Sequence, residues 1–377
     1  MSPPAATATP AGACGRCLRR AWLLSSLSGP MECCARDRAR LLELLALPDE
    51  QLLEALAGRR KPELRARYET FRAEELADDA RLQSICRHRR GYPRALDDPA
   101  APPMLHVEGG TARLSALAAA PVVTILGSSN ASDYGIQMAR SLARGLAASG
   151  VTVAASLTDG IAVAAHAGAL DAGGRSIAVL GGGLRVSCSS RRRALYERLT
   201  RTGCAVSELP PDCPGRRWGL LASERILAEL PRVAVAVEAD AGPGGLAAAR
   251  HAQALGRTVA AIPGRVTSPL SRGTNELLMT GASLVRGARD VLDLLYAADA
   301  TRARKHAAAA VGAAPQNDLP PDLRAVLERV GAGCDTPDGL TRAGIELSAA
   351  LLALSELELR GLLVRGDGGR YLPVNPL

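Results

Sequence analysis

Small polar residues that could bind a phosphate follow an apolar segment near the middle of the chain. Residues 122–126 (VVTIL) are apolar and partly β-branched, which is typical of a buried strand. The turn after them offers donors and close backbone approach at Gly127, Ser128, Ser129, Asn130 and Ser132. Residues 134–149 then have helical spacing, so the free N–H groups at the start of this helix point into the turn. The pattern predicts an anion site, although any sheet of this kind needs a tight turn here.

Three more glycine-containing loops follow predicted strands. They are residues 156–160, which include Gly160, residues 181–183, and residues 242–245, which include Gly244 and Gly245. The carboxyl ends of parallel strands meet at one edge of a sheet, and ligands bind at that edge. We therefore expect the four loops to converge there.

A basic and aromatic segment, Arg216, Arg217 and Trp218, lies in a predicted loop over residues 213–221. Positive charge beside a stacking surface is the chemistry that single-stranded nucleic acid requires. The alternative is that Trp218 fills the core. Residues 191–193 (RRR) are either a solvated helix face or a strip that contacts phosphates.

Residues with catalytic or metal-binding chemistry do not form a convincing set. His166 lies in an alanine-rich helical segment without a neighbouring acid or nucleophile, which favours a packing role. Glu208 and Glu238 each follow a strand, where a carboxylate can orient loops, but nothing pairs them as an acid and a base. Four cysteines could in principle bind a metal. They are Cys14, Cys17, Cys33 and Cys34. The second pair lacks the two-residue spacer, so buried thiols are favoured and no metal or other cofactor is predicted.

Composition limits the class of protein. Of the 377 residues 47% are hydrophobic but only 2% aromatic, so the core must consist of aliphatic side chains. The formal charge is +8 and nearly all the positive side chains are arginines, which fits a polyanionic partner but also a GC-rich genome. No apolar run is long enough to cross a membrane and no leader is evident, so we expect a cytoplasmic protein without membrane contacts. Nine cysteines in such a chain argue against structural disulfides.

The order of predicted elements indicates an α/β protein. Alternating strands and helices predict an extended Rossmann-like, doubly wound and mostly parallel sheet. We expect a disordered start (1–13), a helical module (14–90, like a SAM or helix-hairpin-helix module) that docks on the next domain, the Rossmann-like core (91–297), a linker (298–317) and a winged-helix domain (318–377).

The motifs resemble one family in order and spacing. The segments are LGSSNASDYG (126–135), DGIAVAAHAGAL (159–170), IAVLGGGL (177–184), SELP (207–210), ERILA (224–228) and the residues from PG to GTNELLMTGA (263–282). Together they resemble the DNA-processing protein A family, also called DprA or Smf.

The resemblance implies a non-enzymatic protein that binds single-stranded DNA, protects incoming DNA in natural transformation and loads the RecA recombinase. It also implies a homodimer formed through the core. Carried onto this chain, the phosphate pocket would consist of the 127–132 turn with the loops at 156–160 and 244–245. Arg217 would contact a phosphate, Leu220 stands where the family has an aromatic that packs on a base, and Arg225 and Asn275 would line the pocket.

The chain also departs from the family's usual motifs. Ser129 and Ser223 stand where the family usually has arginine, which removes two positive charges, and Glu224 adds an acid. Two alternatives therefore remain: a scaffold that keeps its protein contacts without binding DNA, and an enzyme like the nucleoside monophosphate phosphoribohydrolases. The enzyme is suggested by residues 243–245 (PGG), but the threonine and glutamate of its motif are missing. The chain lacks the G-x-G-x-x-G pattern of an oxidoreductase after the first core strand.

Overall fold

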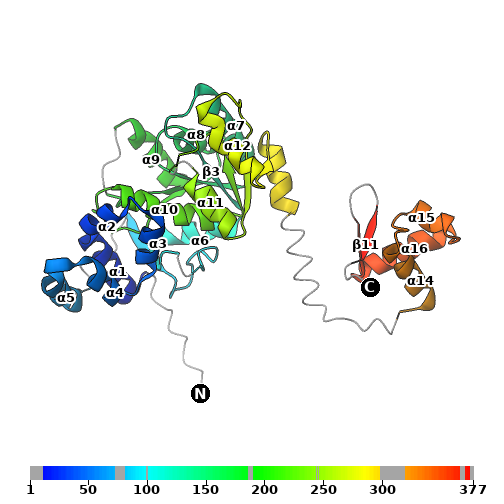
Figure 1. Cartoon of the computed structure of the whole chain (residues 1–377), viewed down its shortest axis with the longest axis horizontal. Coiled ribbons are helices and arrows are strands. Elements are labelled where there is room, and N and C mark those ends of the chain that lie inside the picture. Colours follow the sequence, from blue (N-terminus) through cyan, green and yellow to red (C-terminus); the bar gives the residue numbers. More distant parts are fainter. Residues whose placement is uncertain are drawn as a thin grey trace, which may run out of the picture. The chain divides into compact units, whose positions relative to one another are not determined.

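The computed structural model describes residues 12–72, 81–98, 101–185, 190–242, 244, 246–297, 319–365 and 370–373. The chain divides into two compact units, Met1–Tyr296 and Ala297–Leu377, which we describe separately (Figure 1). Most of the predicted disordered start and the whole of the predicted linker lie outside the described residues.

A nine-stranded sheet forms the centre of the first unit, in the order β1-β2-β6-β5-β4-β3-β7-β8-β9. Its strands are β1 (Leu82–Cys86), β2 (Met104–Glu108), β3 (Val122–Leu126), β4 (Thr152–Ser156), β5 (Ser176–Val179), β6 (Cys204–Ser207), β7 (Val233–Ala236), β8 (Thr258–Ala261) and β9 (Ser283–Leu284). The neighbouring strands from β6 through β5, β4, β3, β7 and β8 to β9 are all parallel. Strand β2 alone runs in the opposite direction and pairs antiparallel with both β1 and β6. The predicted mostly parallel α/β class is confirmed.

Strand β3 is the point where the strand order reverses. Its residue Val123 pairs with Val153 of β4 on one side and with Val233 of β7 on the other. All five of its residues are buried, which explains the continuous apolar run in the sequence. In a doubly wound sheet this reversal, between the carboxyl ends of β3 and β7, is where ligands are expected.

Helices cover both faces of the sheet, because successive strand residues point to opposite faces. On one face Val123 and Ile125 pack against α7 (Asp133–Ala148) and α8 (Ile161–Asp171). On the other face Val122 and Leu126 share a core with α6 (Thr111–Ala119), α10 (Arg217–Glu229), α11 (Ala247–Ala254) and α12 (Arg272–Met279), the last preceded by the short helix η3 (Pro269–Ser271). Helix α9 (Ser190–Thr202) packs near β5 and β6 through Leu199.

The helical module packs directly on this core. It consists of α1 (Gly15–Ser26), α2 (Ser28–Cys34), α3 (Arg38–Ala46), α4 (Asp49–Leu56), η1 (Gly58–Arg60) and α5 (Lys61–Thr70). Its leucines share one apolar cluster with Trp218 and Ala222 of α10, and Figure 1 shows the module (blue) beside that helix. The predicted docking is confirmed.

Two sequence-based boundaries were wrong, and one helix was missed. Residues 82–86, expected in the helical module, form strand β1 of the sheet. Helix α10 begins at Arg217, inside the segment 213–221 that was predicted to be a loop. Its N-cap residue Arg216 makes no side-chain capping hydrogen bond, so the sequence carries no capping signal there. Helix α6 was not predicted at all; Gly110 precedes it without a capping side chain.

The described residues of the second unit form three helices and a small sheet: α14 (Pro321–Gly331), α15 (Pro337–Arg342), α16 (Leu347–Leu359), β10 (Leu363–Arg365) and β11 (Tyr371–Pro373). Leu327, Leu340 and Leu354 meet in its core, and the two strands pair antiparallel. These are the elements that the sequence predicts here, while their assignment as a winged helix stays a prediction. Among the described residues, no helix has both the length and the apolar character needed to cross a bilayer.

A buried carboxyl group lies near the end of α10. Glu229 is fully buried, and neither of its carboxylate oxygens has a hydrogen-bond partner in the described part of the chain. Burial, with a smaller contribution from the charge of Asp98, raises the pKa of Glu229 from 4.5 to about 8 against the opposing effect of Arg225, Arg257 and Arg87. Between these two pKa values the Glu229 carboxyl therefore stays protonated in the folded state and is ionised in the unfolded chain.

We expect Glu229 to make the protein less stable as the pH rises from about 4.5 to about 8, because only the unfolded state ionises easily in this range. Urea unfolding of the wild type and Glu229→Gln, which cannot titrate, tests this. The slopes of unfolding free energy against pH should differ by up to about 1.4 kcal/mol per pH unit. Identical slopes would mean that Glu229 ionises normally in the fold.

Candidate nucleic-acid interface

The turn after β3 is held in place by close backbone contacts. A Cβ atom on Gly127 would lie 2.6 Å from the Ile161 side chain and 2.7 Å from the Glu238 carbonyl oxygen. A Cβ atom on Gly160, whose φ is +73°, would lie 2.4 Å from the Ser128 carbonyl oxygen, which accepts a hydrogen bond from the Ile161 N–H (3.1 Å). The loops after β3, β4 and β7 therefore meet at one edge of the sheet. This agrees with the expected convergence for three of the four predicted glycine-containing loops.

The start of α7 is occupied by a carboxylate of the chain itself. The side chain of Glu238, only 4% exposed, accepts hydrogen bonds from the N–H (2.7 Å) and the hydroxyl (2.8 Å) of Ser132. Ser132 in turn caps α7 by accepting from the Gly135 N–H (3.2 Å). The expectation that Ser132 binds a phosphate is therefore wrong, and the prediction that Glu238 orients loops is confirmed. Ser129 and Asn130 are the exposed residues of this turn.

Arg225 does not line a pocket. It is 2% exposed, forms an ion pair with the buried Glu208, and donates from Nε to the Ala222 carbonyl (3.1 Å). The expectation that Arg225 binds phosphate is wrong, because a buried ion pair holds its guanidinium inside the fold. Asn275 is half-buried and uses both ends of its amide on the backbone of Gly264 (3.1 and 3.2 Å), so it fixes the loop after β8.

The glycines after β5 serve close packing. A Cβ atom on Gly181 would lie 2.6 Å from the backbone of Leu220, one on Gly182 would lie 2.7 Å from Gly215, and one on Gly183 would lie 2.1 Å from the Pro211 carbonyl oxygen. These contacts press residues 211–220 against the carboxyl end of β5. As a result the first turn of α10 lies at the ligand-binding edge of the sheet.

The side chains of the predicted basic and aromatic segment lie on two different faces of helix α10. Trp218 is fully buried, and its indole N–H donates to the Ser28 hydroxyl (2.9 Å) in the helical module. The expectation that Trp218 stacks on a base is therefore wrong, and the alternative core role is the one observed. Arg216 and Arg217 are exposed, and Leu220 is 46% exposed.

Helix α9 braces the loop after β4. The Arg192 guanidinium donates to the Leu157 carbonyl (2.6 Å) and lies 3.7 Å from a carboxylate oxygen of Asp159, whereas Arg193 is exposed. His166 is fully buried between the Ser176 hydroxyl and the Ser156 carbonyl, both at 2.8 Å, and burial lowers its pKa to about 4. Its predicted packing role is confirmed.

The remaining predicted residues lie in the loop after β7. Gly244 is exposed with no atom within 4 Å of an added Cβ, and Gly245 lies outside the described residues. Three of the arginines discussed above, Arg193, Arg216 and Arg217, are exposed to solvent near the carboxyl edge of the sheet.

Known proteins match this chain over more than half of its length. Residues 83–296, more than half of the chain, match the family model described as DNA recombination-mediator protein A. The chain belongs to this family. A protein named DprA from Mycobacterium tuberculosis strain H37Rv is 35% identical over 266 residues, which are 69% of this chain and 66%, just under two thirds, of that protein. Protein Smf of Escherichia coli is 33% identical over 66% of each chain.

Solved structures of the recombination-mediator family show the same fold. The structure of DNA processing protein A from Streptococcus pneumoniae matches with a TM-score of 0.59 and 26% identity, over 74% of this chain and 95% of that one. That of Helicobacter pylori, whose description concerns its binding of single-stranded DNA, matches with a TM-score of 0.50 and 24% identity, over 57% of this chain and 95% of that one.

We expect Arg225→Ala to lower the free energy of unfolding by about 3–5 kcal/mol, because the Glu208 carboxylate would stay buried without its partner. Arg217→Ala, in the same helix but exposed, should change it by less than about 0.5 kcal/mol. Urea denaturation of both variants measures this. Equal stabilities would restore a solvent-facing role for Arg225.

We expect Glu238→Ala to open the start of α7 to an external anion. The variant should lose roughly 1–3 kcal/mol of stability, since Ser132 loses two charge-assisted hydrogen bonds. Sulfate should recover part of the loss, because a helix N-terminus binds anions. Melting temperatures in sulfate and in chloride of equal ionic strength measure the effect. Asp240→Ala, an exposed acid of the same loop, is the control, and an equal sulfate response in both variants would contradict the expectation.

Proposed function

We propose that this protein binds single-stranded DNA without cutting it, protects DNA that enters the cell in natural transformation, and loads the RecA recombinase onto it. In this proposal it acts in the cytoplasm as a homodimer formed through the Rossmann-like core. Membership of the recombination-mediator family supports this role, and so does the formal charge of +8, since nucleic acid is a polyanion.

The observation that carries the proposal is the exposed first turn of α10. Arg216 and Arg217 are exposed to solvent at the carboxyl edge of the sheet, while the buried Trp218 fixes the same turn in the core. Guanidinium groups on a rigid element suit phosphates because their donors form a planar fork. Leu220, 46% exposed, offers an apolar surface one turn further along the helix.

The turn after β3 contributes less in this proposal than the family pattern implies. Ser129 has no positive charge where the family usually has an arginine. The N–H and the hydroxyl of Ser132 already donate to the Glu238 carboxylate and are therefore not available to a phosphate. Ser223 stands where the family usually has a second arginine, and the added acid Glu224 forms an ion pair with Arg38 of the helical module. We therefore propose that the DNA backbone is held chiefly by Arg216 and Arg217, with Ser129, Asn130 and Gly244 beside it.

A binding role without catalysis agrees with how the titratable groups of the edge are engaged. His166 is buried and neutral, Glu208 is paired with Arg225, and Glu238 caps α7 through Ser132. Each of these groups makes a structural contact, and no observation favours the phosphoribohydrolase alternative.

We expect Arg217→Ala to weaken binding of oligo-dT and to make it less sensitive to salt. Each phosphate contact on a single strand contributes about 0.7 to the slope of log K against log salt concentration. Arg217→Ala should therefore lower this slope by about 0.7, and the double variant Arg216→Ala/Arg217→Ala by about 1.4. Fluorescence anisotropy over a salt series measures the slopes.

Arg175→Ala is the matched control for this experiment. Arg175 is an exposed arginine directly before β5, at the opposite edge of the sheet, so its removal lowers net charge equally without touching the proposed surface. Equal slopes for Arg175→Ala and Arg217→Ala would mean that only net charge matters. No binding by the wild type at low salt would support a scaffold without a DNA site.

A further inference from the structure

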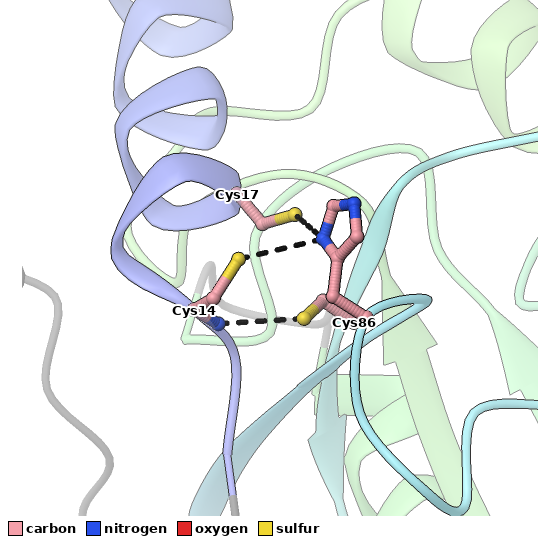
Figure 2. Close-up of side chains that lie close together, drawn as sticks. Cys14, Cys17 and Cys86 are labelled. Atoms are coloured by element: carbon pink, nitrogen blue, oxygen red, sulfur yellow. Dashed lines mark hydrogen bonds between the residues drawn. The ribbon is translucent and has the colours of Figure 1, made fainter.

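Three thiols and an imidazole meet where the helical module joins the sheet. Cys14 and Cys17 lie at the start of α1, Cys86 ends β1, and His88 follows in the next turn. Figure 2 shows Cys14 and Cys17 from one segment facing Cys86 from the other. The two pairs are about seventy residues apart in the sequence, so only the fold brings them together.

The distances suit one tetrahedral ion. The Nδ1 atom of His88 lies 3.4 Å from the Cys14 Sγ and 3.3 Å from the Cys17 Sγ, and all four ligand atoms lie within 4.8 Å of one another. Zinc binds sulfur at about 2.3 Å and imidazole nitrogen at about 2.0 Å, which makes the edges of its tetrahedron about 3.5–3.8 Å long. The cluster therefore needs only small side-chain rotations to surround an ion.

The backbone around the cluster is already fixed. The N–H of Cys14 donates to the Cys86 Sγ (3.3 Å), a type of contact that stabilises a metal-bound thiolate. The turn after β1 is closed by hydrogen bonds from the Arg89 N–H to the Cys86 carbonyl (2.9 Å) and from the Arg87 N–H to the Pro103 carbonyl (3.0 Å). Cys17 and Cys86 are 3% and 0% exposed, whereas Cys14 is half-buried and His88 is exposed, so two of the four ligands are shielded from solvent.

The charge around the cluster also suits a metal–thiolate site. Three thiolates and a divalent ion leave a net charge of −1. Arg16, Arg20 and Arg87 line the same surface cavity as Cys17 and His88, together with Asp49, which pairs with Arg20, and Glu50. The cavity therefore keeps a net positive charge beside the site. The other buried cysteines, Cys204 and Cys213, belong to no such group among the described residues.

We propose that Cys14, Cys17, Cys86 and His88 bind one structural zinc ion that fastens α1 to the edge of the sheet. Three sulfurs with one imidazole in tetrahedral arrangement is a donor set that favours zinc. The predicted partners Cys33 and Cys34 do not join it: they lie at the end of α2, and Cys33 is exposed. This proposal is independent of the proposed DNA binding.

The test begins with the full-length protein purified without chelators. Inductively coupled plasma mass spectrometry should find one zinc ion per chain in the wild type and in Cys33→Ser, the matched cysteine control. The double variant Cys14→Ser/Cys17→Ser should lose the zinc. Since His88 is exposed, His88→Ala should fold and release zinc to a chelator at least tenfold faster than the wild type.

Cobalt substitution gives a readout that needs no variant. The Co²⁺-loaded wild type should show the thiolate charge-transfer and strong visible bands of a tetrahedral site, and zinc should displace them. Wild-type protein without zinc and without these bands would overturn the proposal. So would zinc retained fully by the double variant, or iron in place of zinc.

Discussion

The contact between the buried Glu238 carboxylate and Ser132 governs the edge of the sheet where the strand order reverses. A helix that begins at this point presents free N–H groups and a partial positive charge, which a hydrogen-bond acceptor satisfies and an anion satisfies best. The chain supplies that anion from the end of the neighbouring strand β7. Glycine at position 135 leaves room for it, because a Cβ atom there would lie 2.4 Å from a carboxylate oxygen. The donors of Ser132 at the start of α7 are therefore occupied by the chain's own carboxylate. A ligand from solvent must be bound by residues beside this point.

Helix α10 connects three parts of the molecule. Its inner face places Trp218 in the helical module and Arg225 against Glu208, while its first turn carries Arg216 and Arg217 into solvent. The glycines of residues 181–183 allow this helix to approach the sheet closely. The same packing that docks the helical module thus sets where positive charge is presented. A zinc ion between α1 and β1 would strengthen the other end of that junction.

The sequence alone determined the main architecture and the family. Alternating apolar strands and helices predict the doubly wound sheet because buried parallel strands must be apolar on both faces, and the order of glycine-containing loops carries the family resemblance. His166 and Glu238 were also predicted in their observed roles, since each follows from its local surroundings.

Only the tertiary structure decided which side chains reach solvent and which distant residues meet. Trp218, Arg217 and Arg225 stand in one segment, and their separation into buried and exposed groups follows from what packs on each face of α10. Likewise Cys86 and His88 join Cys14 and Cys17 because an antiparallel edge strand lies beside α1. Local sequence encodes propensity and periodicity, whereas burial and ligand sets depend on contacts between segments far apart in the chain.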